Sequence, residues 1–91
     1  MNQRAQIIVR GIVQGVYFRD STRRKAEEFR VAGIVRNRPD GTVEIVCEGP
    51  EDAVKSLIEW CRHGPRGAFV EHTEITWGTY TGEFRDFRIV Y

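Results

Sequence analysis

Apolar and polar residues recur along this chain with two different periods, which separate its expected strands from its expected helices. A period of two predicts a strand over residues 6–13. Spacings of three and four predict a helix over residues 21–30, which Asp20 or Ser21 can cap at its N-terminus. The apolar stripe of this helix is expected to contain Thr22, Ala26 and Phe29.

A tight turn joins the next two predicted strands, residues 34–37 and 42–48. The intervening Pro39-Asp40-Gly41 is typical of a turn, so these strands should form an antiparallel hairpin. A second helix is predicted to begin at Pro50, because proline is favoured in a first helical turn, and to end near His63. Its buried stripe is expected to contain Val54, Leu57, Ile58 and Cys61.

Two further strands are predicted at residues 68–77 and 84–91. In the first of them Val70 is out of phase with the later apolar positions, which predicts a β-bulge near Glu71 or His72. The order β-α-β-β-α-β-β predicts the α+β class and a ferredoxin-like split βαβ sandwich. We expect one antiparallel sheet with two helices on one face, and the last two strands as neighbours or as one broken edge.

The length of 91 residues favours a single domain, residues 1–91, acting as a monomer. Hydrophobic residues make up 41% and charged residues 30% of the chain, which is typical of a globular protein. No apolar run is long enough to cross a membrane, and no secretory signal precedes the first strand. We therefore expect a cytoplasmic location and no membrane partner.

Charge and cysteine content restrict the function classes further. The net charge of +1 gives no overall field for nucleic acid, although residues 1–45 carry +4 and residues 46–91 carry −3. Cys47 and Cys61 have no metal-ligand spacing, so no metal and no cofactor is expected. Both are interpreted as buried apolar side chains, and the sequence leaves open whether they form a disulfide.

The segment from Val9 to Arg19 contains the candidate chemistry. It runs from the first predicted strand through a glycine-bearing turn into the first predicted helix, whose N-terminal N–H groups favour an anion. Gly15 permits a tight turn close to a ligand, and Arg19 provides a planar fork of donors for phosphate oxygens. The predicted phosphate-binding residues are Gln14, Gly15, Val16, Tyr17, Phe18 and Arg19.

The same segment resembles a family signature. Residues 11–19, Gly-Ile-Val-Gln-Gly-Val-Tyr-Phe-Arg, resemble the first acylphosphatase signature, G-x-V-Q-G-V-x-F-R, and residues 33–43 resemble the second. The chain departs from the second signature at Ile34, where the family usually has Trp or Phe, a position that we interpret as packing. The resemblance implies that Arg19 and Asn37 are catalytic: Arg19 binds the phosphoryl group and Asn37 orients the attacking water. It also implies a small acyl phosphate as substrate and inorganic phosphate as product and inhibitor.

The residues of this segment support that chemistry independently. The predicted cradle has no Cys, Ser or His placed to attack phosphorus, so water is the expected nucleophile. It also offers no acid to protonate a poor leaving group. A carboxylate needs no such acid, because the pKa of its conjugate acid is roughly 4. A carboxyl phosphate is therefore the expected substrate class, with loose selectivity for the acyl group because no acyl pocket is evident.

Two other functions remain open at this level. An RNA-binding RRM shares the strand and helix order, but the third predicted strand, residues 42–48, has no aromatic residue for stacking bases and carries two acids. A non-catalytic domain that binds phosphate or a phosphorylated ligand could use the same cradle. Such a domain would have little need for an amide at Asn37 to orient a water.

Overall fold

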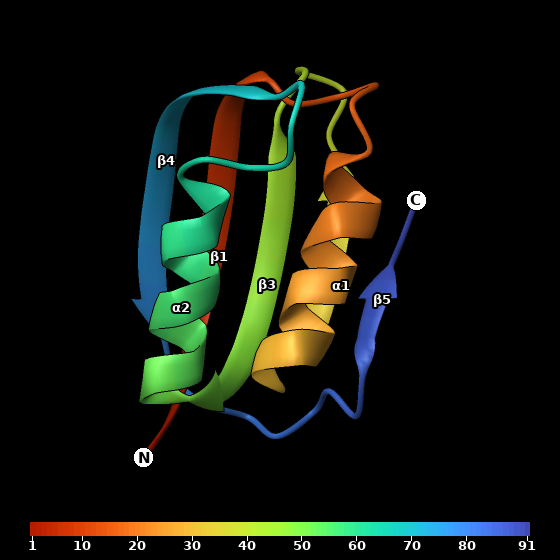
Figure 1. The fold of residues 1–91 in the computed structure, drawn as a ribbon. Coiled ribbons are helices and arrows are strands. Elements are labelled where there is room, and N and C mark those ends of the chain that lie inside the picture. Colours follow the sequence, from red (N-terminus) through yellow and green to blue (C-terminus); the bar gives the residue numbers. More distant parts are fainter.

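Five strands and two helices follow one another in the predicted order. The computed structural model describes all of residues 1–91. The elements are β1 (Asn2–Ile12), α1 (Phe18–Phe29), β2 (Ala32–Asn37), β3 (Val43–Pro50), α2 (Glu51–Cys61), β4 (Phe69–Gly78) and β5 (Phe87–Ile89). Both helices cover the same face of one sheet and leave the other face uncovered (Figure 1), which confirms the predicted α+β sandwich.

The sheet order is β4-β1-β3-β2-β5, and the first four strands in this order pair antiparallel. β5 instead pairs parallel with β2, so the sheet is mixed and the prediction of a purely antiparallel sheet was wrong. The last two strands are not neighbours either: β4 and β5 form opposite edges (Figure 1). The intervening segment therefore has to pass from one edge of the sheet to the other.

The predicted bulge is present in β4. His72 pairs with Arg10 and Val70 pairs with Gly11, so Glu71 is the extra residue of the bulged strand. A side chain at Gly11 would put its Cβ 2.1 Å from the carbonyl oxygen of Phe69, so only glycine allows this close approach of the strands. The bulge lies at the end of the sheet from which the β1–α1 loop leaves.

Helix α1 begins earlier than predicted and without a side-chain cap. Tyr17 is the residue before its first turn and has left-handed dihedrals, φ 61° and ψ 28°. Neither Asp20 nor Ser21 is the cap, because the helix already starts at Phe18. Phe18 is 2% exposed, and its ring packs against that of Trp60 with the centroids 5.6 Å apart and the planes tilted by 54°, so core packing holds the start of the helix in place.

The core fills the space between the helices and the sheet. It contains the expected stripe of α2, and both Cys47 and Cys61 lie in it as free thiols. Burial raises the pKa of Cys47 to about 12, so this thiol is unreactive at neutral pH. The interpretation of both cysteines as buried apolar residues is confirmed. Neither helix has the length and apolar character required to cross a lipid bilayer.

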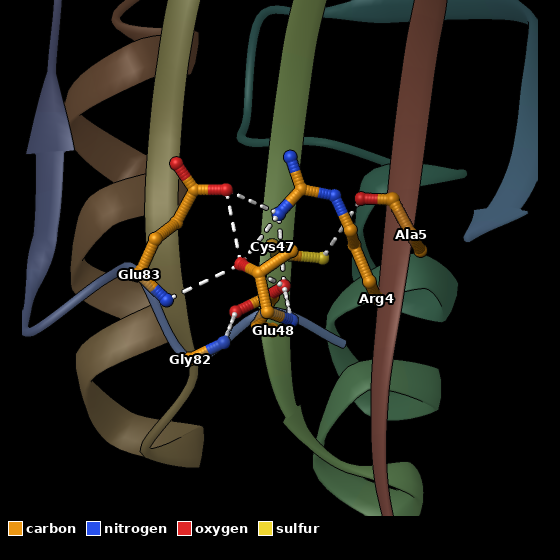
Figure 2. A network of polar contacts seen from close by, with 7 residues as sticks. Arg4, Ala5, Cys47, Glu48, Gly82 and Glu83 are labelled. Atoms are coloured by element: carbon orange, nitrogen blue, oxygen red, sulfur yellow. Dashed lines mark hydrogen bonds and ion pairs between the residues drawn. The ribbon is translucent and has the colours of Figure 1, made fainter. Parts of the chain in front are cut away.

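A charged network holds the segment between β4 and β5 against the uncovered face of the sheet (Figure 2). The carboxylate of Glu48, which is 3% exposed, accepts hydrogen bonds from the backbone N–H groups of Thr81 and Gly82 at 2.8 and 3.0 Å. It also accepts one from Arg4 at 2.8 Å, and Arg4 reaches Glu83 at 2.9 Å. The network therefore fixes the segment that delivers β5 to the far edge.

Candidate active site

The β1–α1 loop turns sharply and leaves its backbone donors unused. Gly15 and Tyr17 both have left-handed dihedrals, with φ of 77° and 61°. The N–H groups of Gly15, Val16 and Tyr17 donate to no backbone carbonyl, and the first bond of the helix runs from Ser21 N–H to the Tyr17 carbonyl. These N–H groups directly precede the first turn of α1, whose own first N–H groups lack helical partners, and such a run of free donors at a helix N-terminus favours an anion.

Arg19 stands in the first turn of α1 with its guanidinium free of carboxylates. It takes part in none of the ion pairs of the protein, although Asp20 is its immediate neighbour. Asp20 also lines the cavity, but its two oxygens contact Arg23 and Arg24, at 3.0 and 3.1 Å. The positive charge of Arg19 is therefore available to an incoming anion.

Asn37, at the end of β2, faces the same cavity as Arg19. Its Oδ1 atom is buried and has no hydrogen-bond partner. A buried amide oxygen without a partner costs free energy of about 1–3 kcal/mol, so such atoms in proteins usually have a bound water or ligand. The arrangement provides an acceptor for one polar molecule inside the cavity.

Gln14 is not among the residues that line the cavity, and its role in phosphate binding stays a prediction. Its side-chain amide donates to the carbonyls of Arg38 and Thr42 at 2.8 and 2.9 Å, and so ties the β1–α1 loop to the β2–β3 turn. Val16 is also absent from the lining and packs against the core, which leaves its backbone N–H as its only possible contribution. Gly15, Tyr17, Phe18 and Arg19 do line the cavity.

The β2–β3 turn is stabilised by hydrogen bonds to the side chain of Asp40, which lies within it. The carboxylate of Asp40 accepts hydrogen bonds from the hydroxyl and the N–H of Thr42 at 2.6 and 3.0 Å. These bonds lower the pKa of Asp40, so that it stays ionised and the turn stays closed at neutral pH. Because the Gln14 side chain donates to two carbonyls of this turn, it fixes the β1–α1 loop against the β2–β3 turn beside Asn37.

The cavity has a volume of about 420 Å³ and an apolar wall that the sequence analysis missed. Val13, Ile89 and Tyr91 contribute to this wall. Ile89 is the last residue of β5 and Tyr91 follows it by two residues; β5 pairs with β2 so that Ile89 is opposite Val35. Nothing in the sequence indicates that the last strand pairs parallel with β2. This pairing brings the C-terminal end of β5 close to Asn37, at the C-terminal end of β2.

The assembled groups suit the transfer of a phosphoryl group to water. The β1–α1 loop and Arg19 line the same cavity as Asn37, whose Oδ1 is buried without a hydrogen-bond partner. No lining residue is a cysteine, serine or histidine, and the one lining carboxylate, Asp20, is paired with Arg23 and Arg24.

Comparison with known proteins also indicates hydrolysis of a phosphorylated substrate. The profile of the family described as Acylphosphatase matches residues 5–89. The chain belongs to the acylphosphatase family. It is 54% identical over 91 residues to the acylphosphatase of Syntrophus aciditrophicus, covering all of this chain and 95% of that one. The acylphosphatase of Pyrobaculum islandicum is 54% identical over 98% of this chain and 95% of its own.

A solved structure extends the agreement to three dimensions. The crystal structure of acylphosphatase from Bacillus subtilis superposes with a TM-score of 0.94 at 40% identity, covering 100% of both chains. The protein is accordingly an enzyme that hydrolyses acyl phosphates. Ile34, where this chain departs from the usual family residue, is not among the residues that line the cavity. It pairs with Val46 in the sheet.

Proposed function

We propose that Arg19 binds the phosphoryl oxygens of the acyl phosphate and that Asn37 orients the water that attacks phosphorus. The proposal rests above all on the buried Oδ1 of Asn37, which has no partner in the protein and shares a cavity with Arg19. An amide in this state accepts a hydrogen bond from water and thereby fixes the direction of the lone pair that attacks. It does so without acting as a strong base.

The reaction then proceeds in one displacement. The water oxygen forms a bond to phosphorus while the bond from phosphorus to the carboxyl oxygen breaks and its electrons leave with the carboxylate. Both protons of the water stay with the inorganic phosphate, one of them passing to a phosphoryl oxygen. Negative charge on the equatorial phosphoryl oxygens is stabilised by Arg19 and by the backbone N–H groups of residues 15–17. The carboxylate departs unprotonated, because the pKa of its acid is roughly 4. No general acid has to be assigned.

The remaining groups of the cradle take supporting parts in this proposal. Gln14 contributes through the hydrogen bonds that fix the β2–β3 turn, and Val16 through its backbone N–H. Inorganic phosphate, the product, fits the same donors and should inhibit competitively. We also propose that the enzyme acts as a monomer in the cytoplasm: a single chain brings Arg19 and Asn37 into one cavity without help from a partner, and free thiols at Cys47 and Cys61 suit a reducing compartment.

The test is hydrolysis of benzoyl phosphate in excess chelator, together with the affinity for inorganic phosphate. Arg19→Ala should lower kcat/KM by roughly 10³-fold or more and weaken phosphate binding, because the guanidinium stabilises the negative charge both of bound phosphate and of the transition state. Arg66→Ala is the matched control, since Arg66 is exposed and lies outside the cavity. Retention of most of the turnover in Arg19→Ala would exclude the assigned role.

Asn37→Ala separates orientation of water from binding of phosphate. We expect kcat to fall by roughly 10²–10³-fold while the phosphate Kd stays within about threefold of the parent, because the amide acts on the water and not on the phosphoryl group. Equal losses in kcat and in phosphate affinity would instead make Asn37 a binding or structural residue.

A further inference from the structure

The guanidinium of Arg19 has one recorded interaction in the protein. Its Cζ lies 5.2 Å from the centre of the ring of Tyr91, within the range of a cation–π interaction. Arg19 makes no hydrogen bond or ion pair with another side chain, whereas Arg4, Arg23 and Arg36 all do. Arg4 also lies over a ring, that of Phe84, but it pairs with Glu48 and Glu83 as well, so Arg19 alone has an aromatic ring as its sole side-chain partner.

An aromatic ring holds an arginine without using its donors. The five N–H bonds of a guanidinium lie in its plane, so a ring over its flat face leaves the N–H edge free for two phosphoryl oxygens. A carboxylate would occupy that same edge and compete with the substrate. Asp20, the nearest candidate along the chain, pairs with Arg23 and Arg24 and not with Arg19.

The fold explains why a ring lies at this point. β5 runs parallel to β2 with Ile89 opposite Val35, and the N–H of Val90 donates to the carbonyl of Val35 at 2.9 Å. Tyr91 lies two residues after Ile89, and Asn37 lies two residues after Val35, so the register of the two strands carries Tyr91 toward Asn37. Ile89, Tyr91, Arg19 and Asn37 all line the one cavity.

Tyr91 is also unusually open for a large aromatic residue, at 97% exposure. Core packing therefore does not account for its side chain, and a change of that side chain should leave the fold intact. An exposed cation–π contact is worth about twofold to fivefold in an equilibrium constant, which is enough to bias the orientation of a long, flexible arginine.

We propose that Tyr91 is a positioning residue, whose ring orients the guanidinium of Arg19 with its N–H edge toward the phosphoryl group. This inference rests on the proposed function of Arg19. It predicts that the aromatic ring matters and that the phenolic hydroxyl does not. It also predicts that the effect appears with every substrate, because the phosphoryl group is common to all of them.

The experiment measures kcat/KM for acetyl phosphate and benzoyl phosphate, and the Kd of inorganic phosphate, in Tyr91→Leu and Tyr91→Phe. In Tyr91→Leu we expect kcat/KM to fall about fivefold for both substrates and the phosphate Kd to rise about twofold to fivefold. Tyr91→Phe should restore the parent values. Tyr80→Leu, at a tyrosine outside the cavity, is the matched control and should behave like the parent. Thermal unfolding checks that all four proteins are folded.

Three results would overturn the inference. Unchanged kinetics in Tyr91→Leu would mean that Arg19 needs no ring, and equal losses in Tyr91→Leu and Tyr91→Phe would point to the hydroxyl. A loss confined to benzoyl phosphate, with phosphate affinity unchanged, would make Tyr91 a contact for the acyl group. Failure of the proposed function is recognised separately, because Arg19→Ala would then retain its activity.

Discussion

Replacing Glu48 by Gln tests how the fold holds β5 in place. The Glu48 carboxylate accepts from Arg4, from the N–H groups of Thr81 and Gly82, and from the Thr81 hydroxyl at 3.0 Å. A glutamine of the same shape keeps one acceptor oxygen and replaces the other with a donor, which cannot accept from an N–H group. The substitution therefore removes the charge and at least one of the bonds to the crossing segment.

The expected loss of stability follows from these contacts. Hydrogen bonds to a charged group contribute about 1.5–3 kcal/mol, and neutral ones about 0.5–1.5 kcal/mol. Arg4 is not left unpaired, because Glu83 still contacts it at 2.9 Å, which keeps the cost below that of breaking an isolated buried pair. We expect the free energy of unfolding to fall by about 2 kcal/mol, and the Tm by roughly 8–16 °C for a domain of this size.

The pH dependence gives a second signature of the same carboxylate. Burial alone would raise the pKa of Glu48, but the hydrogen bonds from Arg4, Thr81 and Gly82 outweigh it and lower the pKa from the usual 4.5. The stabilisation is therefore present at neutral pH and is lost as the pH falls below 4.5 through the folded-state pKa. The difference in stability between the parent and Glu48→Gln should shrink over that interval.

Urea denaturation at several pH values, combined with amide hydrogen exchange, provides the assay. Glu44→Gln is the matched control: Glu44 lies on the same strand and accepts from Gln6 and Arg36, but it holds no part of the crossing segment. Only Glu48→Gln should accelerate exchange at the amides of Thr81 and Gly82. The reasoning is refuted if Glu48→Gln unfolds within about 0.5 kcal/mol of the parent with those amides still protected.

Two further substitutions test the parts that frame the cavity. Gly33→Ala should destabilise the protein by about 3 kcal/mol or more, since the new Cβ would lie 2.0 Å from the carbonyl oxygen of Val46; a chemical denaturation midpoint close to that of the parent would contradict this. Gln14→Ala should cost about 1–2 kcal/mol and lower kcat more than phosphate affinity, because it releases the turn beside Asn37. Parallel loss of kcat and phosphate affinity would show that Gln14 acts on the anion itself.

The sequence was sufficient for features that depend on local patterns. The hairpin of β2 and β3 follows from the turn residues between them, and the bulge at Glu71 follows from one misplaced apolar residue. The cradle was predictable because glycine at 15 and arginine at 19 each have a defined physical role there. All of these signals lie within a few residues of the structure that they determine.

The features that were missed depend on contacts between distant segments. Nothing in residues 84–91 distinguishes a strand that pairs with β4 from one that crosses the sheet to pair with β2. The structure explains the crossing through Glu48. This residue is buried on the face of the sheet that the helices leave uncovered, and the alternation of apolar and polar residues in β3 does not predict its burial. The left-handed Tyr17 was missed for a different reason, since such dihedrals in a non-glycine residue are held by their surroundings and not by local preference.

The edge position of β5 links these observations to the chemistry. Only three residues of β5 pair with the sheet, so its register depends on the anchor at the start of the crossing segment as well as on its own bonds. That anchor, Glu48, lies at the opposite end of β3 from the turn beside Asn37. If Tyr91 positions Arg19, a substitution that loosens this anchor should let β5 shift along β2 and so displace Tyr91 from Arg19. Glu48→Gln should then lower kcat/KM about as much as Tyr91→Leu does, whereas Glu44→Gln should not.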